Sequence, residues 1–192
     1  MIAGPSGVGK GTVVRRVVEL LPDLFLSVSV TTRERRPIER SGLDYVFVSE
    51  ADFDRMIELG ELLEWAEIFG HRSGTPAAPV RRALSTGRDA LLELDVQGAR
   101  QVKDAVPEAV LILLAPPSLD ELERRLRTRG TEDEERLARR LEKAEWELDQ
   151  GSWFDHRVVN DDVEAASSQV AAIIEASRSS SGSPTSEGPS RP

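Results

Sequence analysis

A glycine-rich stretch close to the N-terminus limits the possible folds more than any other part of the chain. It reads Gly4-Pro5-Ser6-Gly7-Val8-Gly9-Lys10-Gly11-Thr12 and leads into an amphipathic run from Val13 to Leu21. Glycines let backbone N–H groups converge on one point, and the helix that follows adds its N-terminal dipole. Lys10 adds a positive charge. The pattern predicts a loop that binds the β- and γ-phosphates of a nucleotide, rather than an ordinary glycine-rich turn.

Two details depart from the usual form of such a loop. The residue after the lysine is normally Ser or Thr, whose hydroxyl binds Mg²⁺, but here it is Gly11, and Thr12 follows one place later. Only Met1-Ile2-Ala3 precede Gly4, although these loops follow a buried strand. We therefore take Thr12 as the candidate Mg²⁺ ligand. We also expect a first strand that is very short or truncated, which would lower the stability of the sheet.

The composition excludes several classes of protein. The 192 residues, 39% of them hydrophobic, suffice for one domain with its own core. The net charge of −9 argues against a general nucleic-acid binder. The chain has no cysteine, no signal-peptide pattern and no apolar run long enough to cross a bilayer. We expect a cytoplasmic protein, monomeric or homodimeric, that binds neither nucleic acid nor a membrane.

Positive charge is nevertheless grouped into two arginine clusters. One lies between Arg33 and Arg40, and the other between Arg124 and Arg140. Arginine forms bidentate hydrogen bonds with phosphate, so either cluster could hold a phosphate group. The alternative is a solvated helix face paired with nearby glutamates, and we expect this to describe more than half of the second cluster.

Predicted strands and helices alternate along the chain. Strands are expected at Leu26–Val30, Ala90–Leu94, Ala109–Ala115 and Arg157–Val159, with helices between them and a last helix at Val163–Ala176. The segment from about Arg33 to Arg82 interrupts the alternation with short β pieces, and residues 70–76 are expected to form a turn. This order predicts an α/β fold: a parallel sheet of the P-loop NTPase type, flanked by helices, with a small mixed α/β subdomain inserted.

Eight motifs occur in an order that resembles one known family. They are Gly-Pro-Ser-Gly-Val-Gly-Lys at 4–10, Thr-Thr-Arg-Glu-Arg-Arg-Pro at 31–37, Gly-Leu-Asp-Tyr at 42–45, Gly-Glu-Leu-Leu-Glu-Trp-Ala at 60–66, Glu-Leu-Asp-Val-Gln-Gly at 93–98, Ala-Pro-Pro-Ser at 115–118, Arg-Gly-Thr-Glu at 129–132 and Val-Asn-Asp at 159–161. The chain resembles guanylate kinase (GMP kinase) over residues 1 to about 176. The resemblance implies transfer of the γ-phosphoryl group of Mg-ATP to GMP, and also to dGMP, in purine metabolism.

The resemblance also implies a division of the chain. A core would comprise residues 1–32, 83–123 and 151–176, with a GMP-binding subdomain at 33–82 and a helical lid at 124–150. Residues 177–192, which are rich in Ser, Pro and Gly, are expected to be a disordered tail.

The family's functional residues can be placed by their motifs. Besides the loop residues 4–12, the resemblance implies Asn160 beside the adenine of ATP. It implies that the following residues bind GMP: Ser29, Arg33, Arg36, Tyr45, Glu64, Thr75 and Asp95. It implies that the following residues carry the phosphoryl transfer: Lys10, Arg36, Arg125, Arg129 and Arg140. Two carboxylates suit guanine, because its N1–H and its amino group both donate, whereas adenine offers an acceptor at N1.

One further residue departs from the family's pattern, and two alternative functions remain. Ser73 stands where the family has a tyrosine that helps to hold the GMP phosphate, and the neighbouring Arg72 is a candidate replacement. One alternative is a catalytically inactive guanylate-kinase-like module that binds phosphorylated protein segments, although Gly4, Gly9 and Lys10 argue against it. The other is a related P-loop kinase for an acceptor such as a phosphorylated ribose, against which Glu64 and Asp95 argue.

Overall fold

Short parallel strands form the centre of the computed structural model, which describes residues 1–37, 39–68, 70–128 and 134–181. Strand β1 (Ile2–Ala3) pairs with β8 (Ile112–Ala115), and β8 pairs with β9 (His156–Val159). Strand β2 (Phe25–Leu26) pairs with β7 (Ala90–Leu91). A parallel bridge between Ile2 and Glu93 joins the two sets. The core is therefore a parallel sheet in the order β2-β7-β1-β8-β9, with the two-residue β1 at its centre.

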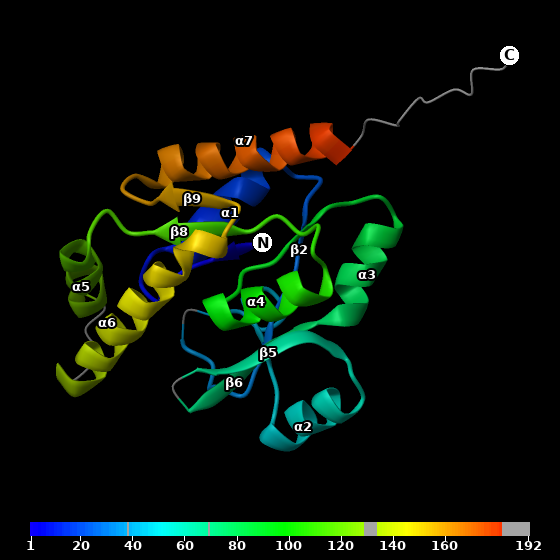
Figure 1. Ribbon diagram of the computed structural model, residues 1–192. Helices are drawn as coiled ribbons and strands as arrows, with labels where there is room; N and C mark the ends of the chain where they lie inside the picture. The colour runs from blue at the N-terminus through cyan, green and yellow to red at the C-terminus, as the bar shows by residue number, and fades with distance from the viewer. Residues whose placement is uncertain (38, 69, 129–133, 182–192) are drawn as a thin grey trace, which may run out of the picture.

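Alternating side chains of these strands face two helical layers. Helices α1 (Lys10–Leu20) and α7 (Val163–Ser181) pack on one face, where Ile2, Ile112 and Val158 are buried. Helices α3 (Ala77–Ser85) and α4 (Val96–Ala105) cover the other face, where Ala3 and Leu111 are buried. Figure 1 shows α7 and α1 above the sheet and α4 below it. The expected parallel sheet between helices is confirmed.

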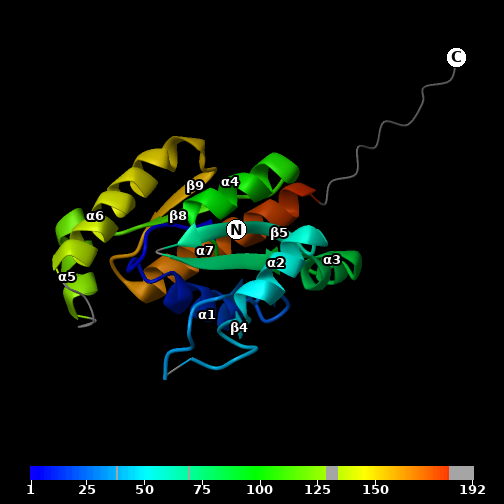
Figure 2. The same ribbon diagram turned by 90° about the horizontal axis from the view of Figure 1, so that it is seen from below.

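The inserted subdomain is a second, mixed sheet with one helix. Its strands are β3 (Val30–Thr31), β4 (Val46–Phe47), β5 (Leu62–Ile68) and β6 (His71–Pro76), in the order β4-β3-β6-β5. Helix α2 (Glu50–Glu58) begins at Ser49, whose hydroxyl accepts a hydrogen bond from the backbone N–H of Asp52 at 3.1 Å. Figure 1 shows α2, β5 and β6 below the core, and Figure 2 shows the same part of the molecule from below.

Two further helices form a pair beside the core. Helix α5 (Leu119–Thr128) and helix α6 (Glu134–Asp149) pack on each other through Leu122, Leu126 and Leu137, and a short 3₁₀ helix, η1 (Gln150–Trp153), leads back to β9. Figure 1 shows α5 and α6 as a pair beside the core. Ala144 and Leu141 complete the apolar cluster that the described residues of the two helices form.

Three expectations about local structure are corrected. Residues 71–76 form strand β6 instead of a turn, because they pair with β5 and β3 on both sides. The expected strand at Leu26–Val30 is split into β2 and β3, which belong to different sheets. Helix α7 continues past Ala176 to Ser181, where the expected tail had begun.

The extension of α7 has a clear cause. The guanidinium group of Arg178 forms ion pairs with Asp23 at 2.8 Å and Asp89 at 2.6 Å, and the Ser179 hydroxyl donates to the Glu175 carbonyl at 3.1 Å. Residues 182–192 lie outside the described part of the chain. Among the helices that are described, none has the length and apolar character needed to cross a membrane.

Candidate functional site

The glycine-rich loop is held in place by close contacts that only glycine permits. Gly4 has φ 150°, and a Cβ there would lie 2.2 Å from the backbone oxygen of Leu114 in β8. Gly9 has φ 95°, and a Cβ there would lie 2.6 Å from the side-chain nitrogen of Asn160. The loop is thus pressed against the carboxyl ends of β8 and β9, where ligands bind in parallel sheets.

The Lys10 side chain folds back over this loop. Its ammonium group donates to the carbonyl groups of Gly4 at 2.6 Å and Pro5 at 3.2 Å. The Glu93 carboxylate lies near the start of α1, 3.6 Å from the position that a Gly11 Cβ would take. Burial raises the pKa of Glu93, while the positive charges of Lys10 and Arg15 act in the opposite direction. Lys10 therefore has an acidic neighbour beside the phosphate loop, which the sequence analysis had not singled out.

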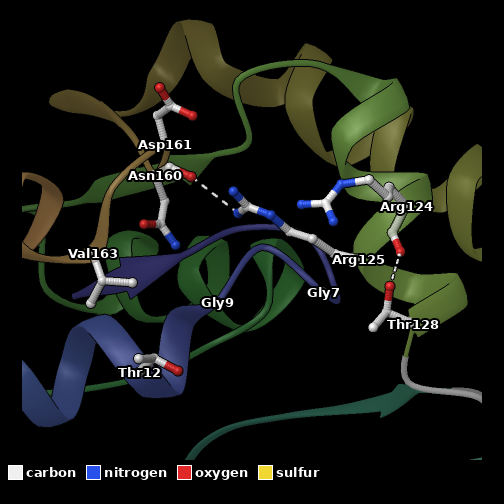
Figure 3. Close-up of a pocket in the computed structure, with 9 residues that line it drawn as sticks. All are labelled: Gly7, Gly9, Thr12, Arg124, Arg125, Thr128, Asn160, Asp161 and Val163. Carbon is white, nitrogen blue, oxygen red and sulfur yellow. Dashed lines mark hydrogen bonds between the residues drawn. The ribbon is translucent and has the colours of Figure 1, made fainter.

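A pocket of about 390 Å³ opens beside the loop. Gly7, Gly9, Thr12, Arg125 and Asn160 are among the residues that line it (Figure 3). The Asn160 side chain donates to the Val8 carbonyl at 2.7 Å, so the amide supports the loop directly. Its oxygen, Oδ1, is buried and has no hydrogen-bond partner within the described residues. The loop, Thr12, Arg125 and Asn160 are therefore brought together, as the sequence analysis predicted.

Helix α5 contributes the cationic wall of this pocket. Arg125 donates to the Asn160 backbone carbonyl at 3.0 Å and to Glu121 at 2.7 Å. Hydrogen bonds from Arg124 and Arg125 lower the pKa of Glu121 to about 2. Other arginines of the second cluster pair with glutamates, including Arg127 with Glu134. The expectation that many of these arginines form surface ion pairs is confirmed.

Arg129 and Arg140 are the other two arginines that the resemblance assigns to the lid. Arg129 lies outside the described residues. Arg140 is half-buried on α6, one turn before Lys143. Its position on the helix is compatible with the expected role, which remains a prediction.

A second group of polar side chains gathers where β5 meets α4. Glu64 and Thr75 are cross-strand neighbours in the β5–β6 hairpin, and the Thr75 hydroxyl donates to the Glu64 carboxylate at 2.6 Å. The Asp95 carboxylate caps α4 by accepting from the Gly98 N–H at 2.8 Å. A Cβ at Gly98 would lie 2.4 Å from Glu64 Oε2 and 3.4 Å from Asp95 Oδ1. Both carboxylates therefore face the same small space, which only a glycine at position 98 leaves open.

Burial decides the charge state of this group. Glu64 is only 6% exposed. Burial raises its pKa to about 7, and the nearby Asp95 charge adds to the effect, whereas the Thr75 hydrogen bond opposes it. Asp95 Oδ2 is buried and lacks a hydrogen-bond partner in the described part of the chain. Asp95 Oδ2 is therefore a buried acceptor with unused capacity, which suits a ligand that donates a hydrogen bond.

Gln101 fixes the subdomain against the core at this point. Its side-chain amide accepts from the Trp65 N–H at 3.2 Å and donates to the Trp65 carbonyl at 2.8 Å. Both backbone groups of the residue after Glu64 are therefore bonded to α4. Ser29 is half-buried between β2 and β3, and its carbonyl accepts from the Val46 N–H at 2.9 Å.

A cationic clamp forms the far end of the subdomain. The Arg33 guanidinium lies 5.4 Å from the centre of the Tyr45 ring and makes two hydrogen bonds to Glu39, at 2.8 and 3.1 Å. Glu39 also accepts from the Arg36 backbone N–H at 2.8 Å. Burial raises the pKa of Tyr45, and the Glu93 charge raises it further. The clamp therefore gathers Arg33, Arg36 and Tyr45, and Tyr45 lies within electrostatic reach of Glu93.

Arg72 points away from this clamp. It forms ion pairs with Glu50 and, at 2.5 Å, with Asp54 on α2, and its guanidinium lies 4.9 Å from the centre of the Phe53 ring. Arg72 thus joins β6 to α2. The suggestion that it replaces the family's tyrosine receives no support from this position. The Ser73 hydroxyl donates to the Val30 carbonyl at 3.2 Å.

Sequence reasoning missed Glu39, Glu93 and Gly98. Glu93 follows the apolar residues Leu91 and Leu92 at the end of a buried strand, which is where ligands bind, so a signal existed. Glu39 and Gly98 carry no such signal, because their contacts come from chain segments that meet only in the folded protein.

Comparison with known proteins agrees with this geometry. The family model described as "Guanylate kinase" matches residues 1–177. A guanylate kinase of Nocardia farcinica is 57% identical over 176 residues, covering 91% of each chain. One from Thermus thermophilus is 53% identical over 182 residues, covering 95% of this chain and 82% of the relative. The crystal structure of a guanylate kinase from Anaplasma phagocytophilum superposes with a TM-score of 0.75 at 32% identity, covering 91% of this chain and 82% of the other.

Proposed function

The chain belongs to the guanylate kinase family, and from that premise we propose that it transfers the γ-phosphoryl group of Mg-ATP to GMP and to dGMP. The products would be ADP with GDP or dGDP, which places the enzyme in purine nucleotide metabolism. The observation that carries the proposal for the acceptor is the convergence of Glu64 and Asp95 on the space beside Gly98. These contacts would involve the base alone, so the same contacts would serve the deoxynucleotide.

When Glu64 is ionised, the two carboxylates select for a base with two adjacent donors. Guanine offers N1–H and the 2-amino group, and Thr75 keeps Glu64 oriented through its 2.6 Å hydrogen bond. Adenine would present its N1 acceptor to the same oxygens and leave them unpaired, at about 1–3 kcal/mol for each buried group. The pair therefore favours GMP over AMP by a mismatch penalty as well as by attraction.

The phosphate of the acceptor would replace Glu39 in the clamp. Arg33 and Arg36 already hold a carboxylate there, and a phosphate dianion offers more oxygen acceptors in a similar arrangement. Tyr45 completes the clamp from the β4 side. Because Glu93 influences Tyr45, the clamp lies near the phosphate loop, and this suits transfer between two bound nucleotides.

The donor nucleotide would bind with its phosphates on residues 4–12 and its base beside Asn160. Lys10 would turn from the carbonyl groups of Gly4 and Pro5 to the phosphates. Arg125 and Arg140, from the α5–α6 pair, would reach the migrating group. Arg129 is proposed for the same role on sequence grounds alone.

The oxygen donors beside the loop fit a magnesium ion. Thr12 lines the pocket and Glu93 lies beside Gly11, and Mg²⁺ prefers a few such oxygens together with phosphates and water. These two residues would hold the ion, which when bound adds charge neutralisation at the phosphates. The acceptor phosphate is ionised at neutral pH and needs no general base. Catalysis by this chain then rests on positioning and on the charges of Lys10 and the arginines.

A coupled assay for ADP formation tests the proposal. GMP and dGMP should turn over with ATP, whereas AMP and ribose 5-phosphate should not. Equal turnover of AMP and GMP would refute the base-recognition argument. Turnover of the ribose phosphate alone would identify a sugar-phosphate kinase, and a folded protein inactive with every acceptor would support the binding-module alternative.

A further inference from the structure

Helix α6 carries a stripe of charged side chains that faces the site. Arg136, Arg140, Lys143 and Glu147 recur at intervals of four, three and four residues, so they lie along one side of the helix. Exposure follows the same pattern: Arg140 and Lys143 are half-buried and Glu147 is 3% exposed, whereas Glu142 and Glu145 are exposed. The C-terminal end of this stripe, at Glu147, therefore packs against the core.

Lys143 meets the acceptor site from this stripe. Its ammonium nitrogen lies 3.7 Å from Asp95 Oδ2 and 3.8 Å from Glu147 Oε1. Asp95 Oδ2 is the buried oxygen that lacks a hydrogen-bond partner among the described residues, and the other oxygen of Asp95 faces Glu64 across Gly98. The Lys143 ammonium group thus lies beside the carboxylates of Asp95 and Glu147. Glu64 lies on the other side of Asp95, across Gly98, so the three carboxylates form a row.

Such a row is unfavourable without a cation. Like charges in a poorly solvated site favour protonation of one member. Burial raises the pKa of Glu147 to about 7, and the charges of Lys10 and Lys143 oppose that rise while Asp95 adds to it. The Lys143 ammonium group lies within 4 Å of both Asp95 and Glu147, so its charge offsets the repulsion between them and holds the Asp95 side chain in one position.

We propose that Lys143 is a positioning residue for acceptor recognition: its ammonium group holds the Asp95 carboxylate in place as an acceptor for the 2-amino group of the purine. The inference rests on the proposed function, because it concerns the same acceptor site. It assigns to the lid helix a part in reading the base, besides the expected part of its arginines at the phosphates. The contact also gives α6 a direct electrostatic link to the residue that begins α4.

The test compares GMP with IMP, which has the same N1–H donor but lacks the 2-amino group. Lys143→Met should raise KM for GMP about tenfold, the effect expected for one charge-assisted interaction, with kcat changed much less. KM for IMP should change by less than about twofold, so the preference for GMP over IMP should fall. Lys143→Arg should restore most of that preference.

A matched control lies on the same helix. Arg139 is exposed and pairs with Glu135 at 2.6 Å, so Arg139→Met removes a cation from the surface of α6 one turn before Lys143. It should leave both KM values unchanged, and circular dichroism of all variants should show an intact fold. If Lys143→Met is unstable, Lys143→Gln, which keeps a polar side chain of similar reach, replaces it in the same comparison.

Three results would overturn the inference. They are an unchanged preference for GMP over IMP in Lys143→Met, an equal rise in KM for both nucleotides, or a lower KM for GMP, which would mean that Lys143 obstructs the base. In each case the parent enzyme would still phosphorylate GMP. An inactive parent enzyme would instead refute the proposed function, so the two failures are distinguishable.

Discussion

Replacement of Gly98 by alanine should impair recognition of the base much more than it lowers the stability of the fold. The added methyl carbon would lie 2.4 Å from Glu64 Oε2, and ordinary contact begins at 3.4 Å, so the carboxylate must move by about 1 Å. The Thr75–Glu64 hydrogen bond is 2.6 Å long and buried, and a displacement of that size disrupts it. Loss of one such bond costs about 1–3 kcal/mol.

The two effects of the substitution have opposite signs for the folded protein. Gly98 lies in the first turn of α4, where alanine is favoured over glycine by about 0.5–1 kcal/mol. The free energy of unfolding should therefore fall by no more than about 2.5 kcal/mol. The N–H of residue 98 remains available to Asp95, so the cap of α4 survives.

The kinetic effect should be larger and confined to the acceptor. KM for GMP should rise at least tenfold, because Glu64 no longer stands where the base donates to it. KM for ATP should stay within about twofold, since the donor pocket is lined by other residues. Gln97→Ala, one residue earlier and exposed, is the control for a change at the start of α4. If Gly98→Ala folds and binds GMP as well as the parent protein, the acceptor site does not lie between Glu64 and Asp95.

Three further predictions concern pH and the loop. Because the pKa of Glu64 is raised to about 7, kcat/KM for GMP should rise about tenfold from pH 6 to pH 8 as the carboxyl ionises, and Glu64→Gln should remove this component of the pH profile. The pKa of Glu147 is raised from 4.5 to about 7, so its contribution to stability is complete below pH 4.5 and is lost as the pH rises through 7. Denaturant titration should therefore show Glu147→Gln to be more stable than the parent at pH 8, by about 1–3 kcal/mol, with the difference shrinking towards pH 5. Gly4→Ala should abolish folding or ATP binding, because its Cβ would lie 2.2 Å from a backbone oxygen. Gly60→Ala, which also has a positive φ (63°) but nothing within 4 Å, should cost only about 1–2 kcal/mol of unfolding free energy.

Most elements of the core could be read from local patterns. The apolar run at 109–115 contains β8, the cap at Ser118 begins α5, and the alternation of strands and helices led to the parallel sheet. These features depend on neighbours in sequence. The errors occurred where partners are distant: β6 reads as a turn until β3 and β5 pair with it, and the end of α7 reads as tail until Arg178 meets Asp23 and Asp89.

The same distinction applies to the candidate site. The loop at 4–12 is one continuous segment whose chemistry is legible from residue types and spacing, and Glu64, Asp95 and Asn160 could be placed from ordered motifs. Arg72 could not, because a guanidinium suits a phosphate and a pair of carboxylates equally well. The folded structure shows that Arg72 pairs with the carboxylates of Glu50 and Asp54.

The amino-acid sequence by itself determined the phosphate loop, the order of strands and helices, and the family. Each depends on residues close together in the chain or on motifs in a particular order. Tertiary structure alone decided that Glu64 and Asp95 meet beside Gly98, that Glu93 stands next to Lys10, and that Lys143 closes the row of acids. Burial and charge pairing arise between segments that are far apart in sequence, so these contacts exist only once the sheets and helices have packed.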